Sequence, residues 1–184
     1  LEEVIDLLGR EVGREEEISL ITSRAMQGEL DFESSLRKRV SLLEGLPVSV
    51  FDKVFNSIHL TPNAQEFISI LQKNGILVGL VSGGFTPMVE RLAKSLDIAY
   101  FSANQLEVKD GFLTGKLVGQ IINPEVKKDT LEQWREELKL SKDRTVAIGD
   151  GANDLLMLKS AGLGIAFCAK EVLKKEIPNH VDKR

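Results

Sequence analysis

Apolar residues in the first part of the chain recur every three to four positions, the spacing of one face of an α-helix. Val4, Leu8 and Val12 illustrate this spacing, and glycines interrupt the pattern several times. The pattern predicts four short helices and no strand over Leu1–Asn56. We interpret residues 1–58 as a helical subdomain, at the low end of size for independent folding.

From residue 59 onward, short apolar runs alternate with amphipathic segments. The run Ile76–Val81 is apolar on both faces, as in a parallel strand that helices cover on both sides. Thr61–Pro62 is predicted to be a helix N-cap followed by a proline in the first turn, and Asp110–Gly111 predicts a hairpin. The predicted strands are Ile76–Ser82, Tyr100–Ala103, Thr145–Ile148 and Leu163–Phe167. The predicted helices are Asn63–Lys73, Pro87–Leu96, Lys127–Leu138, Asn153–Ala161 and one from Lys170. The alternation predicts an α/β core domain over residues 59–184, with a doubly wound, Rossmann-like parallel sheet.

Composition narrows the class of partner. The formal net charge of -4 comes from acidic and basic residues that are interspersed, which favours a small-molecule substrate over nucleic acid. Cys168 is the one cysteine, so no disulfide framework exists, as is usual in the cytoplasm. The longest apolar stretch, Ile76–Val81, is far shorter than the roughly 20 residues that span a bilayer. We therefore expect a cytoplasmic protein without membrane contact, and the sequence leaves a homodimer open.

Candidate chemistry lies where strands end, because ligands of doubly wound sheets bind beyond the carboxyl ends of the strands. Ser82–Gly83–Gly84 follows the first predicted core strand. Glycines let backbone N–H groups approach an anion, and a serine hydroxyl can donate to a phosphate oxygen. The same three residues also suit a plain tight turn.

A second group follows the strand Thr145–Ile148. Asp150 and Asp154 bracket a glycine turn, and Asn153 lies beside the second carboxylate. Such hard oxygen ligands suit Mg²⁺, which uses one or two carboxylates together with water and substrate phosphate. An Asp–Gly turn followed by a helix cap is the alternative. Lys127, at the start of a predicted helix, is by itself an ordinary solvated charge.

The order of these segments resembles the second, third and fourth motifs of the haloacid-dehalogenase-like phosphohydrolases. Val81–Phe85 and Ile148–Leu155 are similar to the corresponding segments of phosphoserine phosphatases, and the likeness extends over essentially the whole chain. The resemblance implies that residues 1–58 act as a cap on the core, that Mg²⁺ is the cofactor, and that O-phospho-L-serine is hydrolysed through an aspartyl-phosphate intermediate, the last step of serine biosynthesis.

The resemblance also implies roles for individual core residues, mainly to stabilise the negative charge of phosphoryl transfer. Asp150 would ligate Mg²⁺, Asp154 would support the metal and the lysine, Asn153 would contact phosphate, Ser82 and the Gly83 amide would hold phosphate oxygens, and Lys127 would neutralise charge at the phosphoryl group.

For the cap, the resemblance places Glu3 on the amino group of phosphoserine and Arg39 on its carboxylate. The planar guanidinium suits bidentate carboxylate binding. Met26 and Phe32 would form an apolar wall over the site. From the residues alone, Met26 and Phe32 suit helix packing and Arg39 suits a surface charge.

One motif of the family has no counterpart here. The Asp-x-Asp-x-Thr segment would precede Glu3, and the sequence holds no two aspartates at that spacing. We therefore expect the first strand, with the nucleophile and the general acid, to lie upstream of Leu1, and these 184 residues to be inactive alone. Two alternatives stay open. One is a phosphatase or phosphotransferase for another small phosphate monoester, and the other is a noncatalytic phosphate-binding module.

Overall fold

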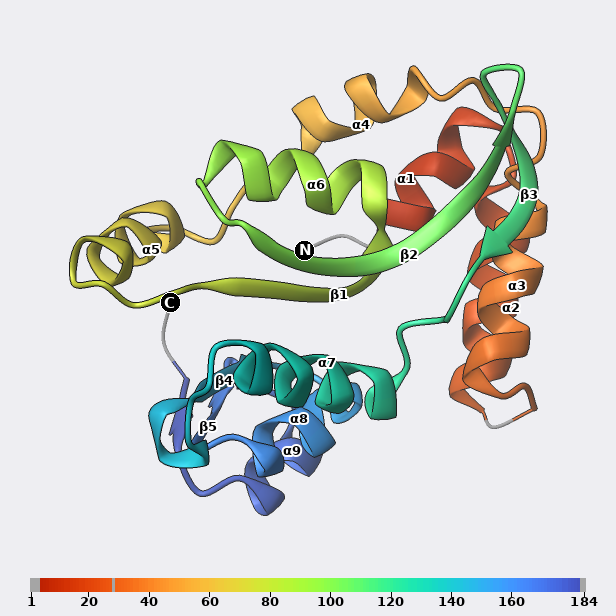
Figure 1. Cartoon of the computed structure of the whole chain (residues 1–184). Coiled ribbons are helices and arrows are strands. Elements are labelled where there is room, and N and C mark those ends of the chain that lie inside the picture. The colour runs from red at the N-terminus through yellow and green to blue at the C-terminus, as the bar shows by residue number, and fades with distance from the viewer. Residues whose placement is uncertain (1–3, 28, 183–184) are drawn as a thin grey trace. The chain divides into compact units, whose positions relative to one another are not determined.

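The computed structural model describes residues 4–27 and 29–182 (Figure 1). The chain divides into two compact units, Leu1–Ile121 and Ile122–Arg184, and each has its own three-stranded sheet. The mixture of helices with parallel strands confirms the predicted α/β class. A separate helical subdomain over residues 1–58 stays a prediction.

The first unit begins with helices, as the apolar spacing predicts. They are α1 (Val4–Glu11), α2 (Glu15–Met26), α3 (Phe32–Ser41) and α4 (Val50–Ser57). Asp31 caps α3, since its carboxylate accepts a hydrogen bond from the Ser34 N–H at 2.9 Å. Leu8 and Leu43 from this segment share one buried core with Phe85 and Leu113, so the helices pack on the strand segments of the same unit.

The sheet of the first unit has the order β1-β2-β3. Its strands are β1 (Gly79–Phe85), β2 (Tyr100–Lys109) and β3 (Phe112–Val118), and its further helices are α5 (Ala64–Lys73) and α6 (Thr86–Ser95). β1 and β2 are parallel, and β2 turns at Asp110–Gly111 into antiparallel β3. The predicted hairpin is therefore confirmed.

Several boundaries in the first unit were predicted wrongly. β1 starts at Gly79 rather than at residue 76, and it continues past Ser82 through Gly83 and Gly84 to Phe85. β2 is longer than predicted because its first half pairs with β1 and its second half pairs with β3. The residue before α5 is Asn63, in the left-handed conformation with φ 64°, so Thr61 is not the N-cap.

The second unit holds a parallel sheet of order β4-β5-β6. Its elements are α7 (Pro124–Glu137), the 3₁₀ turn η1 (Lys142–Arg144), β4 (Val146–Gly149), the 3₁₀ turn η2 (Ala152–Asp154), α8 (Leu155–Ser160), β5 (Leu163–Phe167), α9 (Glu171–Glu176) and β6 (His180–Val181). Lys127 is thus the fourth residue of its helix rather than the first, because the helix begins at Pro124 after the Asn123 cap. Asn153 lies in η2 rather than in the following α-helix.

The two faces of the second sheet differ in burial. Ala147 and Ala166 belong to a buried core with Leu158 of α8 and Leu173 of α9. The paired residues Val146 and Leu163 are exposed, at 56% and 41%. The helices of this unit therefore cover one face of its sheet.

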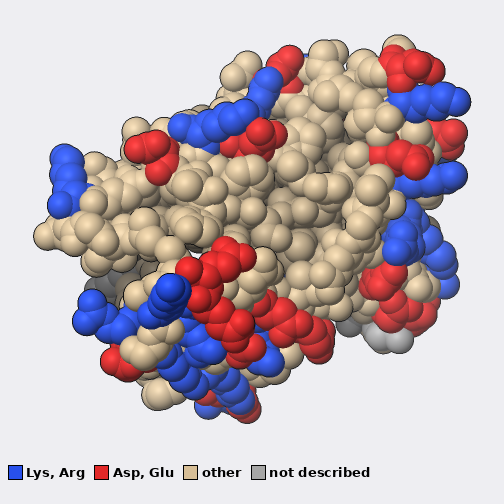
Figure 2. All heavy atoms as spheres, in the orientation of Figure 1, with Lys and Arg blue, Asp and Glu red and all other residues tan. Residues whose placement is uncertain are grey.

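Charged side chains on the second unit are of both signs. On the face seen in Figure 2, acidic and basic groups lie next to one another, and they do not gather into one basic surface. Among the described residues, no helix combines the length and the apolar character that a bilayer crossing requires.

Candidate functional site

A buried carboxylate organises the loop after β4. The Asp154 residue is 6% exposed, and its Oδ1 accepts a hydrogen bond from Lys127 Nζ at 2.7 Å. Its Oδ2 accepts from the backbone N–H groups of Asp150 at 3.1 Å and Gly151 at 3.2 Å. Three donors thus compensate the desolvation of this carboxylate, which a buried charge requires.

Gly149 makes this arrangement sterically feasible. A Cβ atom at position 149 would lie 2.5 Å from the Asp154 Cβ and 2.7 Å from its Oδ2. Such distances are well inside van der Waals contact, so any side chain there would displace Asp154. The glycine at the end of β4 therefore allows the carboxylate to fold back over the strand end.

Lys127 reaches the loop from α7. Asn123 fixes the start of this helix, because its side chain accepts a hydrogen bond from the Val126 N–H at 2.8 Å. The Lys127 side chain is 7% exposed, and Asp154 is its one hydrogen-bond acceptor within the described ranges. An ammonium carries three N–H donors. Two donors therefore remain for an anionic ligand.

Asp150 differs from Asp154 in exposure. Its backbone is held on both sides, by the bond to Asp154 and by a hydrogen bond from the Lys170 N–H to its carbonyl at 3.3 Å. Its side chain is exposed, as is that of Asn153, and no described residue gives the Asp150 carboxylate an ion pair or hydrogen bond. A fixed backbone with an unengaged carboxylate suits a cation ligand.

The exposed carboxylate of Asp150 is of the kind that magnesium takes as a ligand in proteins. In the described part of the chain no three His, Cys, Asp or Glu side chains are grouped to hold a metal ion. Mg²⁺ is usually held by one or two carboxylates, with water and substrate phosphate completing its octahedron. Asp150 fits that requirement.

The C-terminal end of β1, Ser82–Phe85, is held by neutral groups. The register between β1 and β2 slips between Ser82 and Phe85, which leaves the two glycines opposite one step of β2. The Gly84 N–H donates to Ser82 Oγ at 3.0 Å, and Asn104 Nδ2 donates to the Gly83 carbonyl at 2.7 Å. Asn104 was not predicted to belong to the site. Its one signal was an asparagine in a strand context, where this residue type is depleted.

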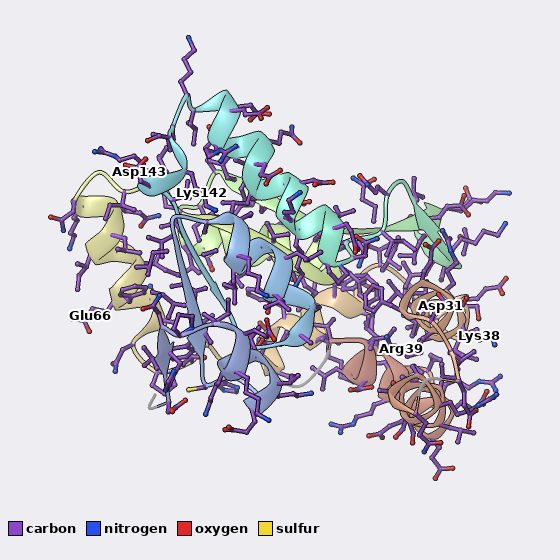
Figure 3. The ribbon with its side chains drawn as sticks, turned by 90° about the horizontal axis from the view of Figure 1, so that it is seen from below. Asp31, Lys38, Arg39, Glu66, Lys142 and Asp143 are labelled. Carbon is purple, nitrogen blue, oxygen red and sulfur yellow. The ribbon has the colours of Figure 1, made fainter. Side chains whose placement is uncertain are left out.

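The predicted substrate-recognition residues are described in part. Arg39 lies on α3, the helix that Asp31 caps (Figure 3), and it is 8% exposed. Its Nη1 lies 3.4 Å from Thr22 Oγ1 of α2, so it is not a solvated surface charge. Phe32 is 42% exposed. Glu3 and the Met26 side chain lie outside the described residues.

The predicted site residues thus fall into two groups. Ser82, Gly83 and Arg39 belong to the first unit, whereas Lys127 and the Asp150–Asp154 loop belong to the second. Within the second unit, Lys127, Asp150 and Asp154 are linked by hydrogen bonds. The roles assigned to all of these residues stay predictions.

Comparison with known families agrees with this fold and loop chemistry. A protein-family model described as haloacid dehalogenase-like hydrolase matches residues 4–159. The chain belongs to the haloacid dehalogenase-like hydrolase family. Within that family, it is similar over its whole length to proteins named phosphoserine phosphatase.

Two of these relatives come from distant organisms. The Lactococcus lactis protein is 51% identical over 183 residues, which are 100% of this chain and 85% of the relative. The Methanocaldococcus jannaschii protein is 46% identical over 182 residues, covering 99% of this chain and 86% of the relative.

Solved structures show the same likeness. A substrate-bound phosphoserine phosphatase complex superposes with a TM-score of 0.89 at 46% identity, over 99% of this chain and 87% of that one. The unliganded probable phosphoserine phosphatase of Vibrio cholerae gives a TM-score of 0.92 at 38% identity. There the match covers 97% of this chain but 55% of the other.

Proposed function

We propose that the protein is a phosphoserine phosphatase, which hydrolyses O-phospho-L-serine to L-serine and phosphate through an aspartyl-phosphate intermediate. The observation that carries the proposal is the buried Lys127–Asp154 pair, whose lysine retains donors for an anion and whose carboxylate also accepts from the Asp150 backbone N–H. Relatives of that name at 51% and 46% identity over nearly the whole chain support the choice of substrate.

Asp150 would hold Mg²⁺ in this proposal. When bound, the ion supplies positive charge that stabilises the phosphoryl oxygens. Lys127 adds a second positive charge, and Asp154 fixes where that charge lies. Asn153, exposed in the same loop, would donate its amide to phosphate.

The first unit would contribute phosphate binding and substrate choice. The Ser82 hydroxyl and the Gly83 amide would hold phosphate oxygens. Arg39 would bind the substrate carboxylate and Glu3 its amino group, with Met26 and Phe32 as the apolar wall. The burial of Arg39 supports this role in carboxylate binding. Arginine is rarely buried, and a buried guanidinium therefore indicates a specific binding partner more than an exposed one does.

The nucleophile is a separate question. Residues 1–184 contain no two aspartates separated by one residue. We therefore propose that these residues alone do not turn over phosphoserine, and that Mg²⁺ binds them weakly through Asp150. Magnesium-dependent hydrolysis by purified residues 1–184, abolished by Asp150→Ala, would contradict this.

The test of the substrate uses the product of the complete coding sequence. With Mg²⁺ present, kcat/KM is measured for phosphoserine, phosphothreonine, glycerol phosphate and p-nitrophenyl phosphate. We expect phosphoserine to be preferred over glycerol phosphate and p-nitrophenyl phosphate by at least about tenfold, since a site built to pair with two charges rejects substrates that lack them. Preference for another monoester would refute the substrate, and absence of hydrolysis of all four would favour the noncatalytic phosphate-binding module.

A matched pair of variants examines Arg39. Arg39→Lys keeps the charge and loses the bidentate fork, so KM for phosphoserine should rise about tenfold or more, while KM for p-nitrophenyl phosphate stays unchanged. Lys38→Met, at the adjacent exposed position of α3, serves as the control and should change neither value. An equal rise for both substrates in Arg39→Lys would exclude carboxylate recognition by Arg39.

A further inference from the structure

The peptide group between Gly83 and Gly84 is held at both of its polar atoms. Its carbonyl oxygen accepts a hydrogen bond from Asn104 Nδ2 at 2.7 Å, and its N–H donates to Ser82 Oγ at 3.0 Å. Because a peptide group is planar, fixing the carbonyl also fixes the direction of the N–H. Asn104 therefore acts on the Ser82 hydroxyl through one rigid peptide plane.

The bond to Gly84 determines what the Ser82 hydroxyl can do. A serine hydroxyl has one donor and two acceptor sites. Its oxygen is an acceptor for Gly84 N–H, and none of the described residues accepts the hydroxyl proton. The hydroxyl proton is consequently available to an anionic ligand, in an orientation that the peptide plane restricts.

Asn104 is well suited to hold this peptide. It is 1% exposed and lies on β2 directly opposite Phe85, where the register between β1 and β2 slips. Phe85 itself is 2% exposed, so the strand end is anchored by packing on one side and by the Asn104 amide on the other. A buried donor has no water to replace its partner, which makes the geometry sharply defined.

We propose that Asn104 is a positioning residue, which orients the Ser82 hydroxyl for a phosphate oxygen by holding the Gly83–Gly84 peptide. The proposal rests on the proposed function for the identity of the substrate, but it requires only that Ser82 binds a phosphoryl group. Gly84 also takes part in this arrangement. A Cβ at that position would lie 3.1 Å from Ser82 Oγ, and it would crowd the hydroxyl that Asn104 orients.

The test is a double-mutant cycle in the product of the complete coding sequence. Ser82→Ala should lower kcat/KM for phosphoserine about 100-fold, the size of effect seen when one preorganised donor is removed. Asn104→Ala should lower it about 10- to 100-fold, since small displacements of a positioned group are costly. In the Ser82→Ala background, Asn104→Ala should lower it less than about threefold, because the group it positions is gone.

Gln72→Ala is the matched control. Gln72 also donates its side-chain amide to backbone carbonyls, those of Leu96 at 3.0 Å and Asp97 at 2.9 Å, within the same unit. We expect it to lower the melting temperature while leaving kcat/KM within about twofold. Asn104→Leu provides a second variant, of similar size and without the donor, if Asn104→Ala does not fold.

A binding measurement separates this inference from the substrate assignment. Titration calorimetry with inorganic phosphate needs no turnover, and Asn104→Ala should weaken phosphate binding about tenfold only when Ser82 is present. If phosphoserine is not hydrolysed but this dependence on Ser82 holds, the proposed function falls and the role of Asn104 stands. Equal losses with and without Ser82, no loss in Asn104→Ala, or an equal loss in Gln72→Ala would overturn the inference.

Discussion

Two strand ends, the last residues of β1 and the loop after β4, are held in place by different kinds of hydrogen bond. The end of β1, Ser82–Phe85, is fixed by neutral donors, the Asn104 amide and the Gly84 N–H. The loop after β4 is fixed by a buried carboxylate that accepts from an ammonium and two backbone N–H groups. Neutral hydrogen bonds contribute about 0.5–1.5 kcal/mol net, whereas a buried charge left without its partner costs several times more. We infer that substitutions in the loop after β4 lower stability more than substitutions at the end of β1.

The largest effect should come from removing the ammonium. Lys127→Met keeps the aliphatic stem and leaves the Asp154 carboxylate buried with two backbone donors. We expect the free energy of unfolding to fall by about 3–5 kcal/mol, measured by urea denaturation. In the product of the complete coding sequence, we expect Mg²⁺-dependent hydrolysis to be lost.

Lys128→Met is the control for that variant. Its ammonium lies 3.5 Å from Glu132 and 3.8 Å from Asp129, and its side chain is 40% exposed. An exposed pair of this kind is worth less than about 1 kcal/mol. Similar losses of unfolding free energy for the two lysine variants would show that burial does not determine how much the loop after β4 contributes to stability.

A smaller loss of stability is expected from alanine substitution of Gly149 than from Lys127→Met, and a still smaller one from alanine substitution of Gly84. Gly149→Ala places its Cβ 2.5 Å from the Asp154 Cβ, which cannot move without the backbone, so we expect a loss of about 1–3 kcal/mol in the free energy of unfolding. Gly84→Ala meets only the Ser82 hydroxyl, at 3.1 Å, and that side chain can rotate.

Gly84→Ala should therefore leave stability within about 1 kcal/mol and weaken phosphate binding instead. Urea denaturation and phosphate titration of both variants provide the comparison. Stability losses of the same size at the two glycines would contradict the inference that the loop after β4 is more sensitive to substitution than the end of β1.

What the sequence could predict follows from the same difference. The bonds within the Asp150–Asp154 loop were predictable because they are local, since Asp154 accepts from backbone N–H groups three and four residues earlier. The bond from Lys127 spans 27 residues, and only the family resemblance indicated that these two residues act together. Asn104 was not predictable, because it acts across the sheet on Gly83, 21 residues away along the chain. The start of β1 was also predicted wrongly. Ile76 and Leu77 are apolar, yet they lie outside the strand and are 50% and 62% exposed. Apolar character alone does not say which residues of a run find a partner strand.

The smallest effect concerns a surface ion pair in the second unit, in which the side chain of Lys174 is 21% exposed and that of Asp182 is 48% exposed. Lys174 Nζ lies 2.8 Å from Asp182 Oδ1 and 3.1 Å from Glu171 Oε1. Its hydrogen bond to Asp182 raises the pKa of Lys174, and the same bond lowers the pKa of Asp182. The Asp182 contribution to stability is thus present above the carboxyl's unfolded pKa and is lost as pH falls through its lower folded pKa.

Lys174→Met removes this pair without removing a buried charge. We expect the melting temperature to fall by about 2 °C or less, because solvent screens exposed pairs. The difference from the wild type should be present at neutral pH, where both groups are charged, and should shrink below about pH 4 as Asp182 is protonated. Melting curves at pH 3 to 9 and at low and high salt measure it. A loss as large as that of Lys127→Met, or one that salt and acid leave unchanged, would show that charge pairing rather than burial distinguishes the loop after β4.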